Sequence, residues 1–133
     1  MTIANTCVVI AAILPVLTVG SAKFSTARLR RSEGGYDNNE PRSWTNRLDG
    51  WKARAVAAQN NGFEALPIFV FAVLAAQQAQ LSQERTDHLA LAFIALRLVY
   101  TAVYLADLAA VRSLVWFAAL VASIAIVSPV LGG

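Results

Sequence analysis

Residues 3–22 read IANTCVVIAAILPVLTVGSA, a segment of twenty residues without one charged side chain. At about 1.5 Å of rise per residue, it forms a helix of roughly 30 Å, which matches the hydrocarbon thickness of a bilayer. Three further segments are similarly apolar and carry at most one charge each: residues 55–76, 89–106 and 113–131. The sequence therefore predicts an all-α membrane protein, with four transmembrane helices in a single domain over residues 1–133.

The composition excludes several other classes of protein. The chain has 133 residues, of which 57% are apolar and 14% are charged, whereas a soluble domain has about 25% charged residues. Disordered chains and disulfide-rich secreted modules do not have this composition. The net charge of +3 would suggest nucleic-acid binding only if the basic residues were spread over a soluble surface, which they are not. We therefore expect no nucleic-acid partner. A soluble helical bundle is the alternative, but it needs a polar stripe along each helix, which these segments lack.

The charged residues are concentrated in one connection. Residues 23–54 hold 12 of the 19 charged side chains and eight of the eleven Lys and Arg residues. By the positive-inside rule this loop faces the cytoplasm, together with the turn at 107–112, and both termini lie on the opposite side. Within the loop we expect a short helix around residues 43–52. We expect Trp44, Trp51 and Trp116, near the cytoplasmic ends of the segments, to lie at the membrane interface. The protein is predicted to be an integral multi-pass protein in contact with membrane lipid.

The first segment has one alternative interpretation. Gly20, Ser21 and Ala22 are small residues of the kind found at signal-peptide cleavage sites. However, no Lys or Arg precedes the segment, and the positive charges follow it, which is the reverse of the order in a secretory signal. We therefore expect it to remain as a membrane anchor.

Two ionisable residues lie inside predicted spans, where charge is costly and usually faces a bundle interior. Glu64 and Arg97 are each nine residues from the cytoplasmic end of their segments, which places both at a depth of about 13 Å. The sequence predicts that they meet as an ion pair. Such a pair can either tie two helices together or form part of a binding site.

The spacing of neighbouring polar residues favours a site. Asn61 and Glu64 are three residues apart, and Arg97, Tyr100 and Tyr104 are separated by three and four, so each set shares one helix face. Two more arginines stand at the cytoplasmic ends of segments, Arg54 before Asn61 and Arg112 before the last span. We predict a polar pocket that opens toward the cytoplasm and suits a small, flexible molecule with carboxylates.

The same residues resemble a known family. Residues 61–67, NGFEALP, fit the N-x-x-E-x-x-P pattern in the second helix of the MAPEG family, the membrane-associated proteins of eicosanoid and glutathione metabolism. Residues 97–104, RLVYTAVY, are similar to the family's R-x-x-Y-x-x-x-Y pattern on the third helix. The basic first loop, the four spans and the length agree too. The chain most resembles a bacterial member, which implies the inner membrane.

The resemblance implies an assembly, a co-substrate and residue roles. Family members form homotrimers of four-helix subunits, and the characterised enzymes bind glutathione on the cytoplasmic side between neighbouring subunits. It implies a glutathione transferase or peroxidase whose second substrate is a lipophilic electrophile or hydroperoxide, and it implies no metal. Arg112 is then the candidate catalytic residue, because an arginine can stabilise the attacking thiolate. The implied glutathione contacts are Arg54, Asn61, Glu64, Arg97, Tyr100 and Tyr104.

Two departures from the family pattern keep an alternative open. Ala57 stands where the glutathione-using enzymes carry an arginine, and Val111 stands at the position of the thiol-activating arginine, one residue before Arg112. The alternative is a non-catalytic lipid-binding or structural membrane trimer of the same fold. A drug/proton exporter is a third class, but it depends on a carboxylate in the first helix, which has none here. Cys7 and His88 are too far apart for an ordinary metal site.

Overall fold

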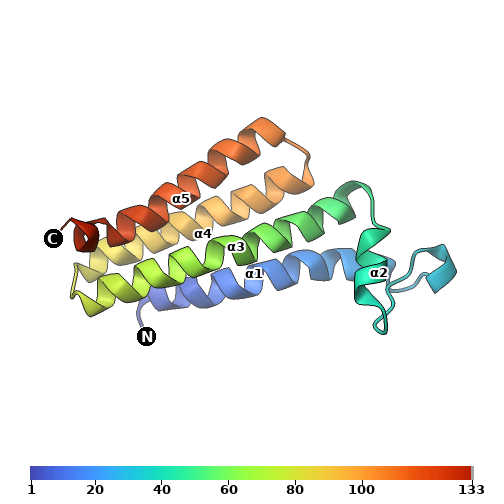
Figure 1. Ribbon diagram of the computed structural model, residues 1–133, viewed down its shortest axis with the longest axis horizontal. Helices are drawn as coiled ribbons and strands as arrows, with labels where there is room; N and C mark the ends of the chain where they lie inside the picture. Colours follow the sequence, from blue (N-terminus) through green and yellow to red (C-terminus); the bar gives the residue numbers. More distant parts are fainter. Residues whose placement is uncertain (133) are drawn as a thin grey trace.

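The computed structural model describes residues 1–132, which form a bundle of four long antiparallel helices with two short helical segments in the first connection (Figure 1). The elements are α1 (Ile3–Thr26), the 3₁₀ turn η1 (Arg31–Glu33), α2 (Pro41–Asn46), α3 (Gly50–Gln78), α4 (Gln83–Leu105) and α5 (Ala109–Leu131).

Each predicted apolar segment corresponds to a longer helix, and only residue 106 of the third segment lies outside its helix, as the C-cap of α4. The largest differences between the predicted and the observed helix ends are at the starts of α3 and α4. These helices begin five and six residues before the predicted starts at residues 55 and 89. Polar residues extend these helices beyond the apolar core, so hydropathy alone does not reveal the ends. The Ser82 hydroxyl, for example, accepts a hydrogen bond from the Arg85 N–H at 3.3 Å and caps the start of α4.

Three of the four long helices are long and apolar enough to cross a membrane: α1, α4 and α5. The second predicted span, residues 55–76 in α3, does not meet the same criterion, because Gln59, Asn60, Asn61 and Glu64 dilute its apolar residues. The structure therefore supports a membrane protein with three candidate spans, and the fourth span stays a prediction.

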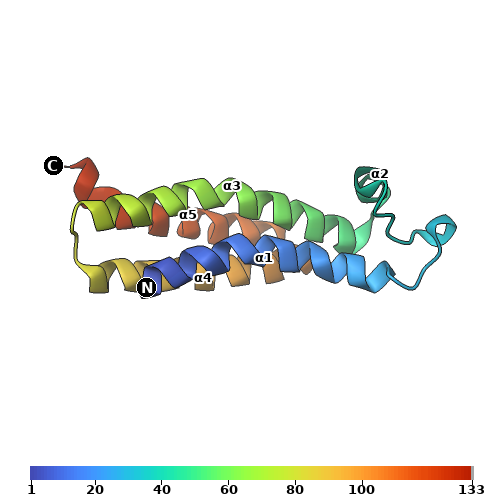
Figure 2. The ribbon, with the colours of Figure 1, turned by 90° about the horizontal axis from the view of Figure 1, so that it is seen from below.

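The helices alternate in direction, so both termini and the turn at residues 79–82 lie at one end of the bundle (Figure 1). The long connection at residues 27–49 and the turn at 106–108 lie at the other, the loop end. Seen from below, α1 and α4 lie on one side and α3 and α5 on the other (Figure 2), and α3 also contacts α4. Toward the loop end α5 diverges from α4 (Figure 1).

Small side chains let the four helices approach closely, as is usual where helices pack inside a membrane. The core is rich in buried alanines from every long helix, and Phe69 of α3 stacks on Phe93 of α4 with ring centroids 3.9 Å apart. Large apolar side chains such as Leu17, Phe71 and Phe117 are instead at least 60% exposed on the outside. A bundle with small residues inside and large apolar residues outside suits a molecule whose outer surface meets lipid rather than water.

The long connection folds around Trp44, which is only 1% exposed. Its ring packs edge-on against Tyr36 with centroids 5.0 Å apart, and its Nε1 donates to the Gly34 carbonyl at 3.2 Å. The prediction of an interfacial Trp44 is therefore wrong. The predicted helix at 43–52 is wrong as well, because Pro41 starts α2 earlier and Gly50, with φ of +55°, lies at the separate start of α3.

Candidate functional site

Asn61 joins the two charged residues that the sequence places inside the bundle. The Nη1 atom of Arg97 donates to Asn61 Oδ1 at 3.0 Å, and Asn61 Nδ2 donates to Glu64 Oε2 at 3.4 Å. Within residues 1–132 no salt bridge connects Glu64 to Arg97, so the predicted direct ion pair is wrong. Arg97 contacts α3 at Asn61, about one turn nearer to the loop end than Glu64. The Asn61 amide can bond to both charged groups, because it has both a donor and an acceptor.

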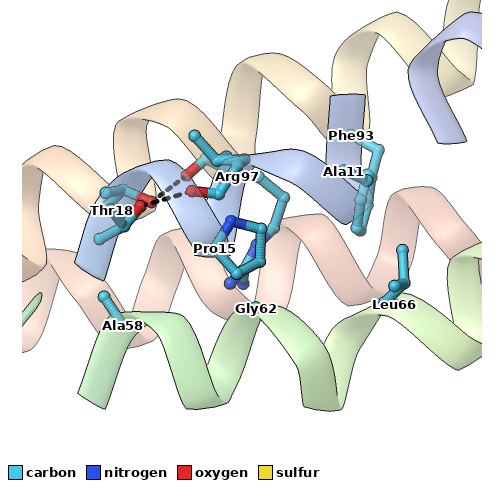
Figure 3. A pocket seen from close by; sticks show the side chains of 10 residues that line it. Ala11, Pro15, Thr18, Ala58, Gly62, Leu66, Phe93 and Arg97 are labelled. Carbon is cyan, nitrogen blue, oxygen red and sulfur yellow. Dashed lines mark hydrogen bonds between the residues drawn. The ribbon is translucent and has the colours of Figure 1, made fainter. Parts of the chain in front are cut away.

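The Arg97 side chain is 4% exposed and is enclosed by α1 as well as α3. Figure 3 shows it beside Pro15 and Gly62, with which it lines a small cavity of about 10 Å³. A Cβ atom on Gly62 would come within 2.5 Å of Pro15 Cγ, so the glycine permits this close crossing of α1 and α3. The crossing holds Asn61, the residue before Gly62, at the level of the Arg97 guanidinium.

A row of stacked groups continues from Arg97 toward the loop end. The Arg97 Cζ atom lies 4.2 Å from the Tyr100 ring centroid, and the Tyr100 and Tyr104 rings pack edge-on at 5.5 Å. Arg112 of α5 lies over Tyr104, with Cζ 4.4 Å from the ring centroid. Cation–π contacts of this kind strengthen when the groups are removed from water.

Six of the seven predicted site residues therefore form one connected series, which we call the Glu64–Arg112 chain. It crosses from α3 through α4 to α5 and has a carboxylate at one end and a guanidinium at the other. Its members, in order of contact, are Glu64, Asn61, Arg97, Tyr100, Tyr104 and Arg112.

Arg54, the seventh predicted residue, is bonded elsewhere. Its Nε donates to the Leu105 carbonyl at 3.1 Å, and its Nη1 lies 3.9 Å from an Asp107 carboxylate oxygen. Leu105 is the last residue of α4, whose unpaired carbonyls carry partial negative charge, so a guanidinium is favourable there. The structure places Arg54 at the end of α4 and does not join it to the Glu64–Arg112 chain.

A cavity of about 250 Å³ lies between α3, α4 and α5, beside the Asn61 end of this chain. Sequence reasoning missed the wall supplied by α5, although the signal was there: Trp116, Ala119, Leu120 and Ser123 follow helical spacing along one face. The lining residues are Asn61, Glu64, Ala65, Ile68, Phe93, Arg97, Trp116, Ala119, Leu120 and Ser123.

The arrangement can bind a molecule that carries charges of both signs. Guanidinium groups hold carboxylates in bidentate geometry, and the Glu64 carboxylate can accept from an ammonium or an amide. Arg112, at the other end, can stabilise a further anionic group. Within the described part of the chain, no group of three or more His, Cys, Asp or Glu side chains is placed to hold a metal ion.

Comparison with known proteins gives one result. The sequence model of the MAPEG family matches residues 3–130, which is nearly the whole chain. Searches of the curated proteins and of the solved structures found no match.

Proposed function

Because the chain belongs to the MAPEG family, we propose that it is an integral membrane protein that binds glutathione and uses it as a co-substrate. The proposed activity is that of a glutathione transferase or peroxidase acting on lipophilic electrophiles or hydroperoxides. The observation that carries the proposal is the Glu64–Arg112 chain, which joins the polar residues of both family motifs to Arg112 in one series of contacts.

The proposed roles follow the charges of the ligand. Glutathione has two carboxylates, one ammonium group and a thiol. We assign a carboxylate to Arg97, the ammonium to Glu64, and further polar contacts to Asn61, Tyr100 and Tyr104. Arg54 is a further proposed contact at the rim, which requires its guanidinium to exchange the Leu105 carbonyl for a ligand carboxylate.

Arg112 is the proposed catalytic residue, because its guanidinium stabilises the thiolate that attacks. In a transferase reaction the sulfur forms a bond to the electrophilic carbon as the leaving group departs with its electron pair. In a peroxidase reaction two glutathione molecules are oxidised to one disulfide, while the hydroperoxide is reduced to an alcohol and water. The stacking of Arg112 on Tyr104 orients the guanidinium in both cases.

We also propose that the protein is a homotrimer in which α3 is the fourth span. Glu64 is exposed on the single chain, and a carboxylate facing lipid would be very unfavourable. Phe63, Phe71 and Leu74 are 43–60% exposed and extend the same side of α3 at helical spacing. A neighbouring copy packed on this face would shield the carboxylate and complete the binding site.

The proposed location is a bacterial inner membrane, with the loop end in the cytoplasm. Residues 23–54, which span the first connection and the helix ends beside it, carry eight of the eleven basic residues, and they lie at the same end of the bundle as Arg112. Glutathione would then enter from the cytoplasm, and both termini would lie on the other side.

A thermal-shift titration of the purified protein in detergent tests the proposal. Glutathione should raise the melting temperature, and an analogue with a methyl group in place of the thiol should do so too, because the carboxylates and ammonium supply most of the contacts. Ultraviolet absorbance of the bound thiolate should appear with wild type and disappear in Arg112→Ala. The matched control is Arg28→Ala, in the exposed first connection. A protein with neither stabilisation nor thiolate absorbance does not use glutathione.

One observation favours the alternative of a lipid-binding or structural trimer without glutathione chemistry. Six of the ten side chains that line the 250 Å³ cavity are apolar, and Arg54 is bonded to Leu105 instead of facing the cavity. Phospholipid that stays bound through purification, together with no effect of glutathione on the melting temperature, would support this alternative.

A further inference from the structure

A second, smaller cavity adjoins Arg97 on the side of α1. It measures about 10 Å³, and the residues around it come from α1, α3 and α4 (Figure 3). The 250 Å³ cavity, which α5 helps to line, adjoins the same guanidinium. Apart from Arg97, no residue that lines the small cavity is a proposed glutathione contact.

The Arg97 guanidinium has more hydrogen-bond donors than its protein partner uses. A guanidinium carries five N–H bonds, and within residues 1–132 this one donates only to Asn61. In the same part of the chain, no side-chain nitrogen or oxygen is both sealed from water and without a hydrogen-bond partner. The remaining Arg97 nitrogens therefore border space that a water molecule can enter, although the side chain is 4% exposed.

The α1 wall of the small cavity supplies an acceptor that the helix itself does not satisfy. Pro15 has no N–H, so the carbonyl of Ala11, about one turn earlier, lacks the donor that a regular helix provides. Both residues line the cavity, as Arg97 does. In the described part of the chain, Arg97 forms no direct hydrogen bond to this carbonyl.

Another proline in the chain shows how such a carbonyl is satisfied. Pro129 in α5 likewise removes the helical donor for the Ala125 carbonyl. That carbonyl accepts from Arg85 Nη2 at 2.5 Å and from Ser128 Oγ at 3.1 Å. A guanidinium therefore bonds directly to the carbonyl in α5, whereas the contact in α1 needs a group that bridges the cavity.

The volume and the lining fit one water molecule. A cavity of about 10–15 Å³ holds a water that has two to four polar partners. A water here can accept from Arg97 and donate to the Ala11 carbonyl. Thr18 and Thr101 also line the cavity, and each hydroxyl donates to a carbonyl of its own helix, at 2.8 and 3.0 Å, so its oxygen can accept as a further partner.

We propose that a buried water molecule occupies the small cavity and joins the Arg97 guanidinium to the Ala11 carbonyl. The water gives Arg97 a partner on α1 in addition to Asn61 on α3, and it ties α1 to α4. Buried water of this kind is part of the structure and is costly to remove. It fixes the guanidinium beside the 250 Å³ cavity, whether or not the protein uses glutathione.

A crystal structure of the complete wild-type protein, at a resolution that shows ordered water, tests the proposal directly. We expect one density peak within about 3.2 Å of both an Arg97 nitrogen and the Ala11 carbonyl oxygen. A map that shows other buried waters in the bundle and none here would overturn the proposal. A direct hydrogen bond between Arg97 and Ala11 would overturn it too.

A pair of variants with nearly the same shape tests the proposal through stability. Ala58 lines the cavity and is 3% exposed. In Ala58→Thr the added hydroxyl can take the place of the water, whereas Ala58→Val puts only carbon against the guanidinium and the carbonyl. We therefore expect Ala58→Thr to have the higher melting temperature in detergent. The wild-type structure decides the question if these side chains prevent folding.

Ala72 of α3 provides the matched control, because it is 0% exposed and belongs to the apolar core. A hydroxyl gains no polar cavity there, so Ala72→Val should have a higher melting temperature than Ala72→Thr. The expected result is thus an opposite order at the two positions. If the valine variant were the more stable of the pair at both positions, the cavity would be dry and the proposal would be overturned.

Discussion

The amide of Asn61 performs two tasks that no charged side chain could combine. Its oxygen accepts from the buried guanidinium of Arg97, and its nitrogen donates to the Glu64 carboxylate. A buried charge is tolerated only when it is compensated and hydrogen-bonded. Arg97 donates a hydrogen bond to Asn61 and lies over the ring of Tyr100, so Glu64 does not have to contact it directly and stays open to a ligand.

Replacement of Asn61 should therefore destabilise the protein more than replacement of Glu64. Asn61→Leu leaves the Arg97 guanidinium without this acceptor, and we expect a loss of about 2 kcal/mol in the free energy of unfolding. Glu64→Gln keeps a side-chain oxygen that can accept from Asn61 and should change it by less than about 1 kcal/mol. Detergent-induced unfolding measures both variants without ligand. Equal losses would contradict the assignment of Asn61 as the main partner of Arg97, and a larger loss in Glu64→Gln would assign that role to Glu64.

At the scale of helices, the crossing of α1 and α3 depends on the contact between Pro15 and Gly62. Pro15 lies inside α1, where it removes one backbone hydrogen bond, a loss that membrane helices tolerate. Gly62 lies opposite it and has no side chain that would push the helices apart. The close approach fixes the position of α3 relative to α1 along the bundle axis. It thereby also fixes the level of Asn61 relative to Arg97.

A methyl group at this crossing should therefore destabilise the bundle, and trimming the proline should relieve it. Gly62→Ala places Cβ 2.5 Å from Pro15 Cγ, and overpacking of this kind costs about 1–3 kcal/mol. The double variant Gly62→Ala with Pro15→Ala removes that atom and should recover part of the stability. The melting temperatures of wild type, both single variants and the double variant measure the coupling. Additive losses would mean that the two residues do not limit the approach.

The end of α4 is the second helix feature with a measurable consequence. Arg54 donates to the Leu105 carbonyl, so Arg54→Ala should lower the free energy of unfolding by about 0.5–1.5 kcal/mol in the absence of any ligand. Arg47→Ala, in the exposed connection, is the matched control and should have little effect. Unchanged stability in Arg54→Ala would show that the bond to Leu105 contributes nothing.

At the scale of the whole molecule, the alternating helices separate two chemically distinct ends. The loop end holds the folded basic connection, with Trp44 at its centre, and the start of α5 with Arg112. The other end holds both termini and the turn at residues 79–82. If all four long helices cross the bilayer, these two ends lie on opposite sides, and the excess of basic residues orients the loop end toward the cytoplasm.

Cysteine labelling in sealed vesicles tests this orientation. In a Cys7→Ser background, Asn38→Cys in the first connection should react with a membrane-impermeant maleimide only in inverted vesicles. Gln80→Cys, in the turn at the opposite end, should react only in right-side-out vesicles. Labelling of both positions from the same side would show that α3 does not span the membrane.

The sequence by itself determined the membrane character, the alternation of the long helices and the residues from which the site is built. These properties are local: uninterrupted apolar length selects a membrane helix, and spacing by three or four residues selects a helix face. The sequence also identifies Glu64 and Arg97 as the charged residues inside the second and third apolar segments.

Only the tertiary structure decided which groups meet. The relative height of α3 and α4 makes Asn61 the partner of Arg97, the open carbonyls at the end of α4 attract Arg54, and the divergence of α5 accompanies a cavity lined by Trp116 and Ser123. Shifting a helix by one turn moves each of its side chains by about 5.4 Å, farther than a hydrogen bond reaches. Packing between helices sets that shift, and a one-dimensional pattern does not contain it.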